Sequence, residues 1–343
     1  MSLFLGRFFC ISSVTCSQKS PLIIRHIYAI VSVKGGDNVP KWSSIFAVLL
    51  LAQSLFIQPI SAQKLIPMGH TVEVQIFMEQ YFVTEKQQLQ SGEQIHVHDE
   101  LQSINGQRVT KELLQKPVDR SVKLTFTRAT KTYNVTCNAK EWQQLQQKLS
   151  NETDGIGTLT YVTENKKQFG ALGHQINLRN NGSFDSGYIH LANIQSVVKS
   201  KKNTPGYKII HPTLLKQQVG DLEKNVAVGI FGAWREQKMK QEKAMTVAED
   251  SQIKLGEAYI LTQIVADKVE RFKIDITAIE QGQLQFTVLD KQLLASTGGV
   301  IQGMSGSPII QNELFIGAVT HMFVESPKKG VAITMTEMLK KSN

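Results

Sequence analysis

The chain has few cysteines: Cys10, Cys16 and Cys137 are the only three among 343 residues. Three thiols cannot build the disulfide framework that stabilises small secreted domains. The cysteines do not stand at the spacing of a zinc finger, and no histidine-rich tract accompanies them. The sequence therefore predicts a fold held by its hydrophobic core, without a structural metal site.

The chain also lacks a basic stripe. Lys and Arg outnumber Asp and Glu by 38 to 29, a net charge of +9, but they are scattered and no run interleaves them with aromatics. Nucleic-acid-binding surfaces concentrate their basic residues, so we expect no nucleic-acid partner. Hydrophobic residues are 41% and charged residues 20% of the chain, which is typical of a globular protein. The length allows two modest domains.

The apolar run at residues 45–60 is short for a transmembrane helix, which needs roughly 20 residues. It also contains two glutamines and a proline. Lys41 precedes it and Ile60-Ser61-Ala62 follows it, the order of a signal peptide with small residues before the cleavage site. We expect residues 39–63 to be a signal peptide or a retained membrane anchor, and a buried core helix is the alternative.

Export signals normally stand at the start of a chain, whereas this one follows a segment without a clear domain pattern. One coding of Lys34-Gly35-Gly36-Asp37 is AAA GGA GGT GAT, a strong bacterial ribosome-binding sequence, and Val39 stands where a GTG start codon would lie. We therefore hypothesise that residues 1–38 are an untranslated extension. Reading the codons of residues 34–39 tests this, because any other Gly-Gly codons would remove the argument.

Residues 65–137 alternate apolar and polar side chains in three runs, at 71–76, 121–127 and 133–137, which predicts half-buried strands. Asn105-Gly106 suits a tight turn, and Thr110 is a candidate cap for a helix over 110–116. The order of strand, D-x-L-x-x-I-N-G-Q at 99–107, helix and strand resembles a PDZ domain. That resemblance implies a module that binds peptides as an added strand. A structural β module without a ligand is the alternative.

Residues 141–343 contain short strand-like runs separated by glycine and polar turns. This pattern predicts an antiparallel β barrel or sandwich. The strongly charged segment 234–249 is expected to be an exposed loop or hairpin. The predicted fold is therefore mainly β, with a small PDZ-like domain followed by a barrel domain.

Ser305 stands in a glycine-rich loop, Gly303-Met304-Ser305-Gly306-Ser307-Pro308. A serine hydroxyl needs a base and a pocket for the oxyanion, and flanking glycines let adjacent amides converge on one point. The amides of Gly303 and Ser305 are the candidate oxyanion donors. The pattern resembles the nucleophile loop of chymotrypsin-like peptidases, with Ser307 as the competing serine. An isolated match of this kind would more often be a simple Gly-Ser turn.

His174 follows a glycine-rich apolar turn, Phe169-Gly170-Ala171-Leu172-Gly173, and is the candidate general base. His321 is the rival base, because it follows a predicted strand close to the nucleophile. His190 and His211 have no supporting context. A buried, hydrogen-bonded histidine is the commoner meaning of any one of these residues.

Asp290 ends an apolar strand 15 residues before Ser305 and is the candidate for the acid that orients an imidazole. Asp267 and Asp275 are alternatives with poorer context. A solvated turn is the default meaning of any single aspartate. Acyl transfer by such a triad requires no metal and no organic cofactor, and we predict none.

Together these motifs resemble the stage IV sporulation protein B (SpoIVB) peptidase family from about Leu65 to the C-terminus. The resemblance implies a PDZ domain followed by a serine peptidase domain, and a triad at His174, Asp290 and Ser305. The matching segments are Leu65-Ile66-Pro67, Gly155-Ile156-Gly157-Thr158, Gly170-Ala171-Leu172-Gly173-His174, Gly220-Asp221, Gly229-Ile230-Phe231-Gly232, residues 257–262 and, most specifically, residues 297–311.

The resemblance also implies a biological setting: export from the forespore into the space between the two membranes of a developing endospore. There the family cleaves itself, including in trans, and then cleaves a membrane-bound inhibitor of an intramembrane metalloprotease, which releases the late mother-cell sigma factor. The implied partners are a protein substrate at the membrane surface and a peptide ligand of the PDZ-like module. Two departures stand out: Met68 replaces a usual glycine, and residues 177–182 look shortened and lack acidic residues.

Two other functions fit parts of the pattern. One is a non-catalytic signalling protein in which the PDZ-like module captures peptides and the barrel is a scaffold. The other is an envelope quality-control protease, although those enzymes normally place the PDZ domain after the peptidase domain. The intact serine loop, His174 and Asp290 favour the sporulation peptidase.

Overall fold

The computed structural model describes residues 63–179, 182–212, 217–236 and 243–342. The predicted untranslated extension at 1–38 and the predicted signal peptide or anchor at 39–63 therefore lie outside the described residues, apart from Gln63. So does the middle of the charged segment 234–249. Within the described ranges, no helix has the length and apolar character needed to span a membrane.

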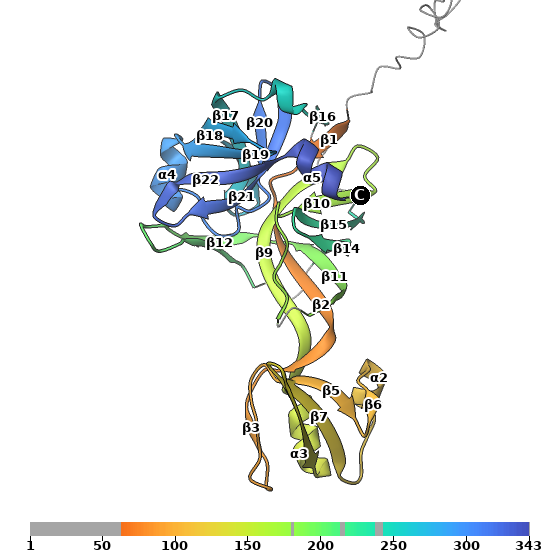
Figure 1. The fold of residues 1–343 in the computed structure, drawn as a ribbon. Coiled ribbons are helices and arrows are strands. Elements are labelled where there is room, and N and C mark those ends of the chain that lie inside the picture. Colours follow the sequence, from red (N-terminus) through yellow and green to blue (C-terminus); the bar gives the residue numbers. More distant parts are fainter. Residues whose placement is uncertain (1–62, 180–181, 213–216, 237–242, 343) are drawn as a thin grey trace, which may run out of the picture. The chain divides into compact units, whose positions relative to one another are not determined.

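A first antiparallel barrel is built from segments far apart in the sequence (Figure 1). Six strands pair in a ring that runs β2, β9, β10, β15, β14, β11 and back to β2. Two further strands, β1 and β16, extend the sheet from β9. These strands are β1 Lys64–Pro67, β2 Thr71–Val83, β9 Leu149–Thr163, β10 Gln168–Ala171, β11 Phe184–Leu191, β14 Gln218–Val226, β15 Gly229–Trp234 and β16 Met245–Thr246.

The alternation predicted for residues 71–76 forms the start of β2. Val72, Val74 and Ile76 point inward and are fully buried, while Glu73 and Gln75 remain partly exposed. Because side chains alternate between the two faces of a strand, this pattern places one face of β2 in the core of the first barrel.

The second barrel is closed, in the order β17, β18, β19, β22, β21 and β20. Its interior holds a large aliphatic and aromatic cluster that includes Ile260, Phe272 and Phe286. The elements are η2 Asp250–Gln252, β17 Gly256–Val265, β18 Lys268–Glu280, β19 Gln283–Val288, α4 Lys291–Thr297, β20 Pro308–Gln311, β21 Leu314–Phe323, β22 Ser326–Thr334 and α5 Met335–Ser342. The prediction of a mainly β fold with antiparallel barrels is confirmed.

A separate two-stranded hairpin contacts both barrels. It consists of β12 Ile194–Val198 and β13 Tyr207–Ile210, which pair with each other. Tyr207 forms a parallel bridge with Gln302, just before the predicted nucleophile loop. The hairpin therefore supports that loop from one side.

The small module has its own hydrophobic core. Its predicted turn is present, with Asn105 and Gly106 at φ of 50° and 79°, and the side chain of Thr110 caps the helix as expected by accepting from the Leu113 N–H. The elements are β3 Gln87–Gln88, β4 Gln94–Ile95, β5 Glu100–Ile104, β6 Gln107–Arg108, α2 Lys111–Gln115, β7 Val122–Arg128, β8 Lys131–Cys137 and α3 Ala139–Gln146. That this module is a PDZ domain stays a prediction.

The strand pairings place the module between β2 and β9, as an insertion within the first barrel. The predicted boundaries at 65–137 and 141–343 differ from this arrangement, because β1 and β2 pair with barrel strands. At the other end, Trp142 and Leu145 of α3 pack into the core of the module. The reason is physical: alternation predicts a half-buried strand but does not specify which sheet it joins.

Asp99, the first residue of the D-x-L-x-x-I-N-G-Q motif, is fully buried. Arg128 donates to it from Nε at 2.7 Å and from Nη2 at 2.8 Å, and the Tyr133 hydroxyl donates at 2.5 Å. Burial by itself would raise the pKa of Asp99, but hydrogen bonds from Arg128, Tyr133 and the His96 amide together hold it below its usual value. The motif aspartate is thus a structural anchor that ties β5 to β7 and β8.

Candidate active site

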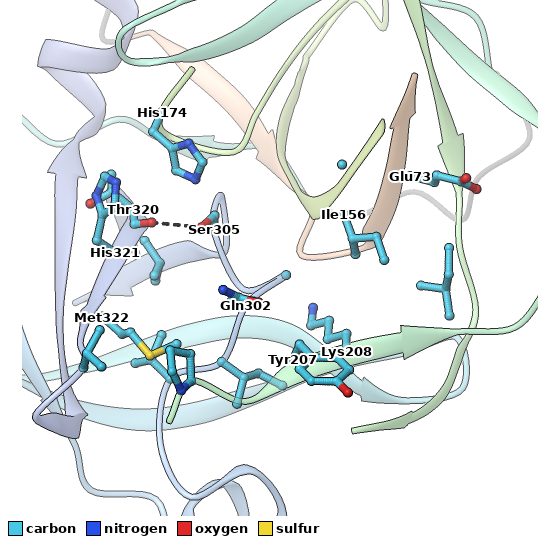
Figure 2. A pocket seen from close by; sticks show the side chains of 18 of the residues that line it. Glu73, Ile156, His174, Tyr207, Lys208, Gln302, Ser305, Thr320, His321 and Met322 are labelled. Carbon is cyan, nitrogen blue, oxygen red and sulfur yellow. Dashed lines mark hydrogen bonds between the residues drawn. The ribbon is translucent and has the colours of Figure 1, made fainter. Parts of the chain in front are cut away.

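Ser305 lies in the loop that leads into β20, at the wall of a cavity of about 750 Å³ (Figure 2). The side chain is half-buried, and its hydroxyl donates to the backbone oxygen of Thr320 at 2.9 Å. His174 and His321 line the same cavity. The first barrel contributes His174 and the second contributes Ser305 and His321, so both barrels form the site.

The glycines of the loop are required by its geometry. Gly303 and Gly306 have φ of 93° and 92°, a region that L side chains rarely adopt. At Gly306 an added Cβ would lie 2.1 Å from the backbone oxygen of Thr158. The loop can therefore pack against β9 only with glycine at this position.

Three amides of the loop donate to backbone carbonyls of the protein. Met304 donates to Ile301 O, Ser307 donates to Met304 O, and Gly306 donates to Val319 O, at 3.1, 2.9 and 2.7 Å. Within the described part of the chain, the amides of Gly303 and Ser305 have no acceptor. These are the two amides predicted to hold the oxyanion, and their lack of a protein acceptor supports that prediction.

Ser307, the competing serine, is completely buried. Its hydroxyl lies 3.4 Å from that of Thr158. A side chain enclosed in this way cannot reach a peptide carbonyl, which leaves Ser305 as the accessible serine of the loop.

His174 follows β10 after two residues in the left-handed region, Leu172 at φ 72° and Gly173 at φ 70°. Its Nδ1 lies 2.8 Å from the backbone oxygen of Gln175. When Nδ1 carries the proton and donates to this carbonyl, Nε2 is left with a lone pair, which is the form that a general base needs.

The sequence model of one known family, SpoIVB peptidase S55, matches residues 144–339, more than half of the chain. The chain belongs to this family. It is a serine peptidase of sporulation, and the resemblance predicted from the motifs is confirmed. The matched span runs from the end of α3 into α5. No curated protein matches the chain.

In this SpoIVB-family peptidase, the ring of His174 lies beside that of His321 on β21. The two ring centroids are 5.0 Å apart, with an interplanar angle of 32°. Burial lowers the pKa of His321, and the neighbouring His174 lowers it further. A lowered pKa favours the neutral form of His321 at pH 7, and within the described residues no hydrogen bond joins the two rings.

Asp290 lies elsewhere in the second barrel. It is the N-cap residue of α4, and its Oδ1 accepts from the Leu293 N–H at 2.9 Å. Neither Asp290 nor the alternatives Asp267 and Asp275 line the cavity that holds His174 and Ser305. The structure thus brings together two of the three predicted triad residues, and the role of Asp290 stays a prediction that its contacts do not support.

The cavity contains two acids that the sequence analysis did not single out, Glu73 on β2 and Asp154 on β9. Alternation placed Glu73 on the polar face of its strand, but no local signal connected either acid with the serine loop. The lining also includes apolar side chains, among them Val300, Ile301 and Met322. Such a surface suits an extended peptide with apolar side chains.

Thr158 on β9 holds the serine loop at two points. Its hydroxyl donates to Gly303 O at 2.7 Å, and its amide donates to Ser305 O at 2.8 Å. The sequence analysis quoted Thr158 only as the end of Gly155-Ile156-Gly157-Thr158, because nothing local shows that this motif packs against residues about 145 positions away.

We expect Asp290→Asn to distinguish a helix cap from an orienting acid. Asparagine caps a helix about as well as aspartate does, so the variant should fold normally. Because the Asp290 carboxylate accepts from the backbone amides of Leu293 and Lys273 and, within the described residues, from no histidine, kcat/KM should fall less than roughly tenfold. An acid that orients the base would instead lose about 10⁴-fold in kcat on this change. Thermal unfolding and initial rates of the purified variant decide between the two roles.

Proposed function

We propose that this peptidase is exported from the forespore into the space between the two spore membranes and acts there as an endopeptidase. It cleaves itself, in trans as well, and then cleaves a membrane-bound inhibitor of an intramembrane metalloprotease. That cleavage releases the late mother-cell sigma factor. Membership of the family supports this proposal, and the pairing of an accessible Ser305 with His174 in one cavity is the observation that carries it.

The proposed chemistry is acyl transfer to Ser305. The Ser305 hydroxyl gives up its hydrogen bond to the Thr320 carbonyl, 2.9 Å between the two oxygens, and its proton passes to His174 as Oγ attacks the peptide carbon. The carbonyl oxygen becomes an oxyanion held by the amides of Gly303 and Ser305. His174 then gives its proton to the leaving amine, and water hydrolyses the acyl-enzyme by the reverse proton transfers.

The Gln175 carbonyl replaces a carboxylate in this scheme. It lies 2.8 Å from Nδ1 of His174; because a carbonyl can only accept, it favours the tautomer protonated at Nδ1 and stabilises the imidazolium through a hydrogen bond. A neutral acceptor stabilises that cation less than an ionised acid does. We therefore infer a modest intrinsic rate, which is compatible with cleavage of a few chosen proteins rather than general digestion.

The partners in the proposal are a protein substrate at the membrane surface, a second copy of this chain, and a peptide ligand of the small module. The envelope location rests on the apolar run at 45–60. The non-catalytic signalling alternative is set aside because the family is one of serine peptidases.

Mixing active and inactive chains tests self-cleavage. A tagged Ser305→Ala chain serves as substrate for an untagged wild-type chain, and N-terminal sequencing locates the cuts. We expect the same new N-termini in the tagged chain as in wild type incubated alone. If both chains stay intact at micromolar concentration, self-cleavage is not an activity of this protein.

The cellular role is tested by sporulating cells whose only copy of the gene carries Ser305→Ala. The proposal predicts that the chain accumulates at full length and that release of the late mother-cell sigma factor stops. Normal release in cells that contain only this variant would show that the peptidase acts on another target.

A further inference from the structure

Lys208 is a buried charge that the chemistry above does not use. It lies on β13, is 2% exposed, and lines the floor of the cavity that holds Ser305 (Figure 2). Its Nζ contacts three threonine hydroxyls, those of Thr71 at 3.0 Å, Thr262 at 3.2 Å and Thr158 at 3.4 Å. These threonines belong to β2, β17 and β9, so one ammonium group joins strands of both barrels.

Each N–H donor of the Lys208 ammonium has a threonine hydroxyl as its acceptor. A lysine ammonium has three N–H donors and no acceptor, and three hydroxyl oxygens surround it. Within the described residues none of its partners is a carboxylate, and burial lowers the pKa of Lys208 to about 7. An unpaired buried cation is costly, whereas methionine would fill the same space without that cost. A lysine at this position therefore indicates a task other than stability.

The same residue supports the serine loop through its backbone. The Lys208 amide donates to Gln302 O at 3.1 Å. A trans peptide plane points its N–H opposite to its C=O, so this bond fixes the direction of the Gly303 N–H. The aliphatic stem lies directly beneath Gly303, where an added Cβ would be 2.9 Å from Cδ of Lys208.

The ammonium acts on the next peptide plane through Thr158. A threonine hydroxyl has one proton, and the Thr158 hydroxyl accepts from Lys208 while it donates to Gly303 O. As an ammonium ion Lys208 can only donate, so in its charged form it keeps that single proton directed at Gly303. Both peptide planes that flank Gly303 are thus held by Lys208, one directly and one through Thr158.

We propose that Lys208 is a positioning residue for the oxyanion hole, and that its ammonium, acting through Thr158, holds the Gly303 carbonyl and so fixes the bend of the loop whose Gly303 and Ser305 amides receive the oxyanion. The proposal rests on Ser305 as the nucleophile. Lys208 itself does not touch the reacting atoms in this scheme. Its effect should therefore be seen in the rate of the covalent step and not in folding.

Lys208→Met tests the proposal with a fluorophosphonate, whose phosphoryl oxygen occupies the oxyanion hole while the serine is modified. We expect phosphonylation of Ser305 to be about 10- to 100-fold slower than in wild type, the scale of a small misplacement in an active site. The melting temperature should stay the same or rise, because a buried charge is removed. The exposed Lys202→Met, on the same hairpin, is the matched control and should label at the wild-type rate.

Thr158→Val keeps the shape of the side chain and removes the hydroxyl link. We expect it to slow labelling to a similar degree, and the Lys208→Met/Thr158→Val double variant to be little slower than either single variant, because both changes break one connection. Wild-type labelling rates in folded Lys208→Met or in Thr158→Val would overturn the proposal. If the wild-type protein is not labelled at Ser305, the assignment of Ser305 as the nucleophile is wrong. The proposed role of Lys208, which depends on it, is then wrong as well.

Discussion

Replacing Ser305 by alanine should reduce proteolysis by at least about 10³-fold, because the residual rate then depends only on binding and on the oxyanion pocket. Alanine fits the loop, since the Ser305 hydroxyl makes a single hydrogen bond, to the Thr320 carbonyl. The fold should therefore be unchanged. Hydrolysis of labelled casein and the loss of full-length chain measure the rate, and circular dichroism checks the fold.

Ser307→Ala is the matched control two residues away. The Ser307 hydroxyl is buried against Thr158, so its loss should lower stability by about 1 kcal/mol and leave most of the activity. If Ser305→Ala retained substantial proteolysis while Ser307→Ala abolished it, the assignment of the nucleophile would be reversed.

His174→Ala should lose about 10³-fold or more in kcat/KM, because the variant lacks the base proposed to take the Ser305 proton. His321→Ala should lose much less, roughly tenfold or under, since a neutral neighbour removes packing but not the base. The two rings are 5.0 Å apart in the same cavity, which makes this pair a stringent comparison. The pH dependence of kcat/KM, measured from pH 5 to pH 9, shows where each variant loses activity on the acid side.

A loss that is larger for His321→Ala than for His174→Ala would make His321 the base. In that case the Gln175 carbonyl would have no catalytic role. Similar losses for both variants, with additive effects in the double variant, would also contradict the assignment of a single base to His174.

The parts of the site that the sequence predicted are those formed by residues adjacent to one another in the chain. Ser305, its flanking glycines and the two amides without acceptors lie within residues 303–306, so local backbone geometry defines them. His174 could be predicted because the turn that presents it, Leu172-Gly173, is also contiguous. Family membership then followed from several such local motifs.

Asp290 shows where this reasoning stops. An aspartate between a strand and a helix is the common signal of an N-cap, and an orienting acid gives the same local signal. Only the partners distinguish the two roles, and here the carboxylate accepts from the backbone amides of Leu293 and Lys273. A distance of 15 residues along the chain says nothing about proximity to His174 in space.

Thr158 and Lys208 were missed for a related reason. Each acts on the serine loop across a large sequence separation, and threonine and lysine within strands are usually surface residues. The placement of β2 was missed similarly, since its alternation fits either the small module or the barrel. Strand partners depend on the global closure of the sheet, which a single local pattern does not contain.

The most direct test of the central claim is to locate the adduct after reaction of the intact protein with a fluorophosphonate, using peptide mass spectrometry. The structure predicts one modified residue, Ser305, with labelling that is abolished in Ser305→Ala, strongly reduced in His174→Ala and retained in Ser307→Ala. Modification at Ser307, or undiminished labelling of the His174→Ala protein, would contradict a peptidase built on Ser305 and His174.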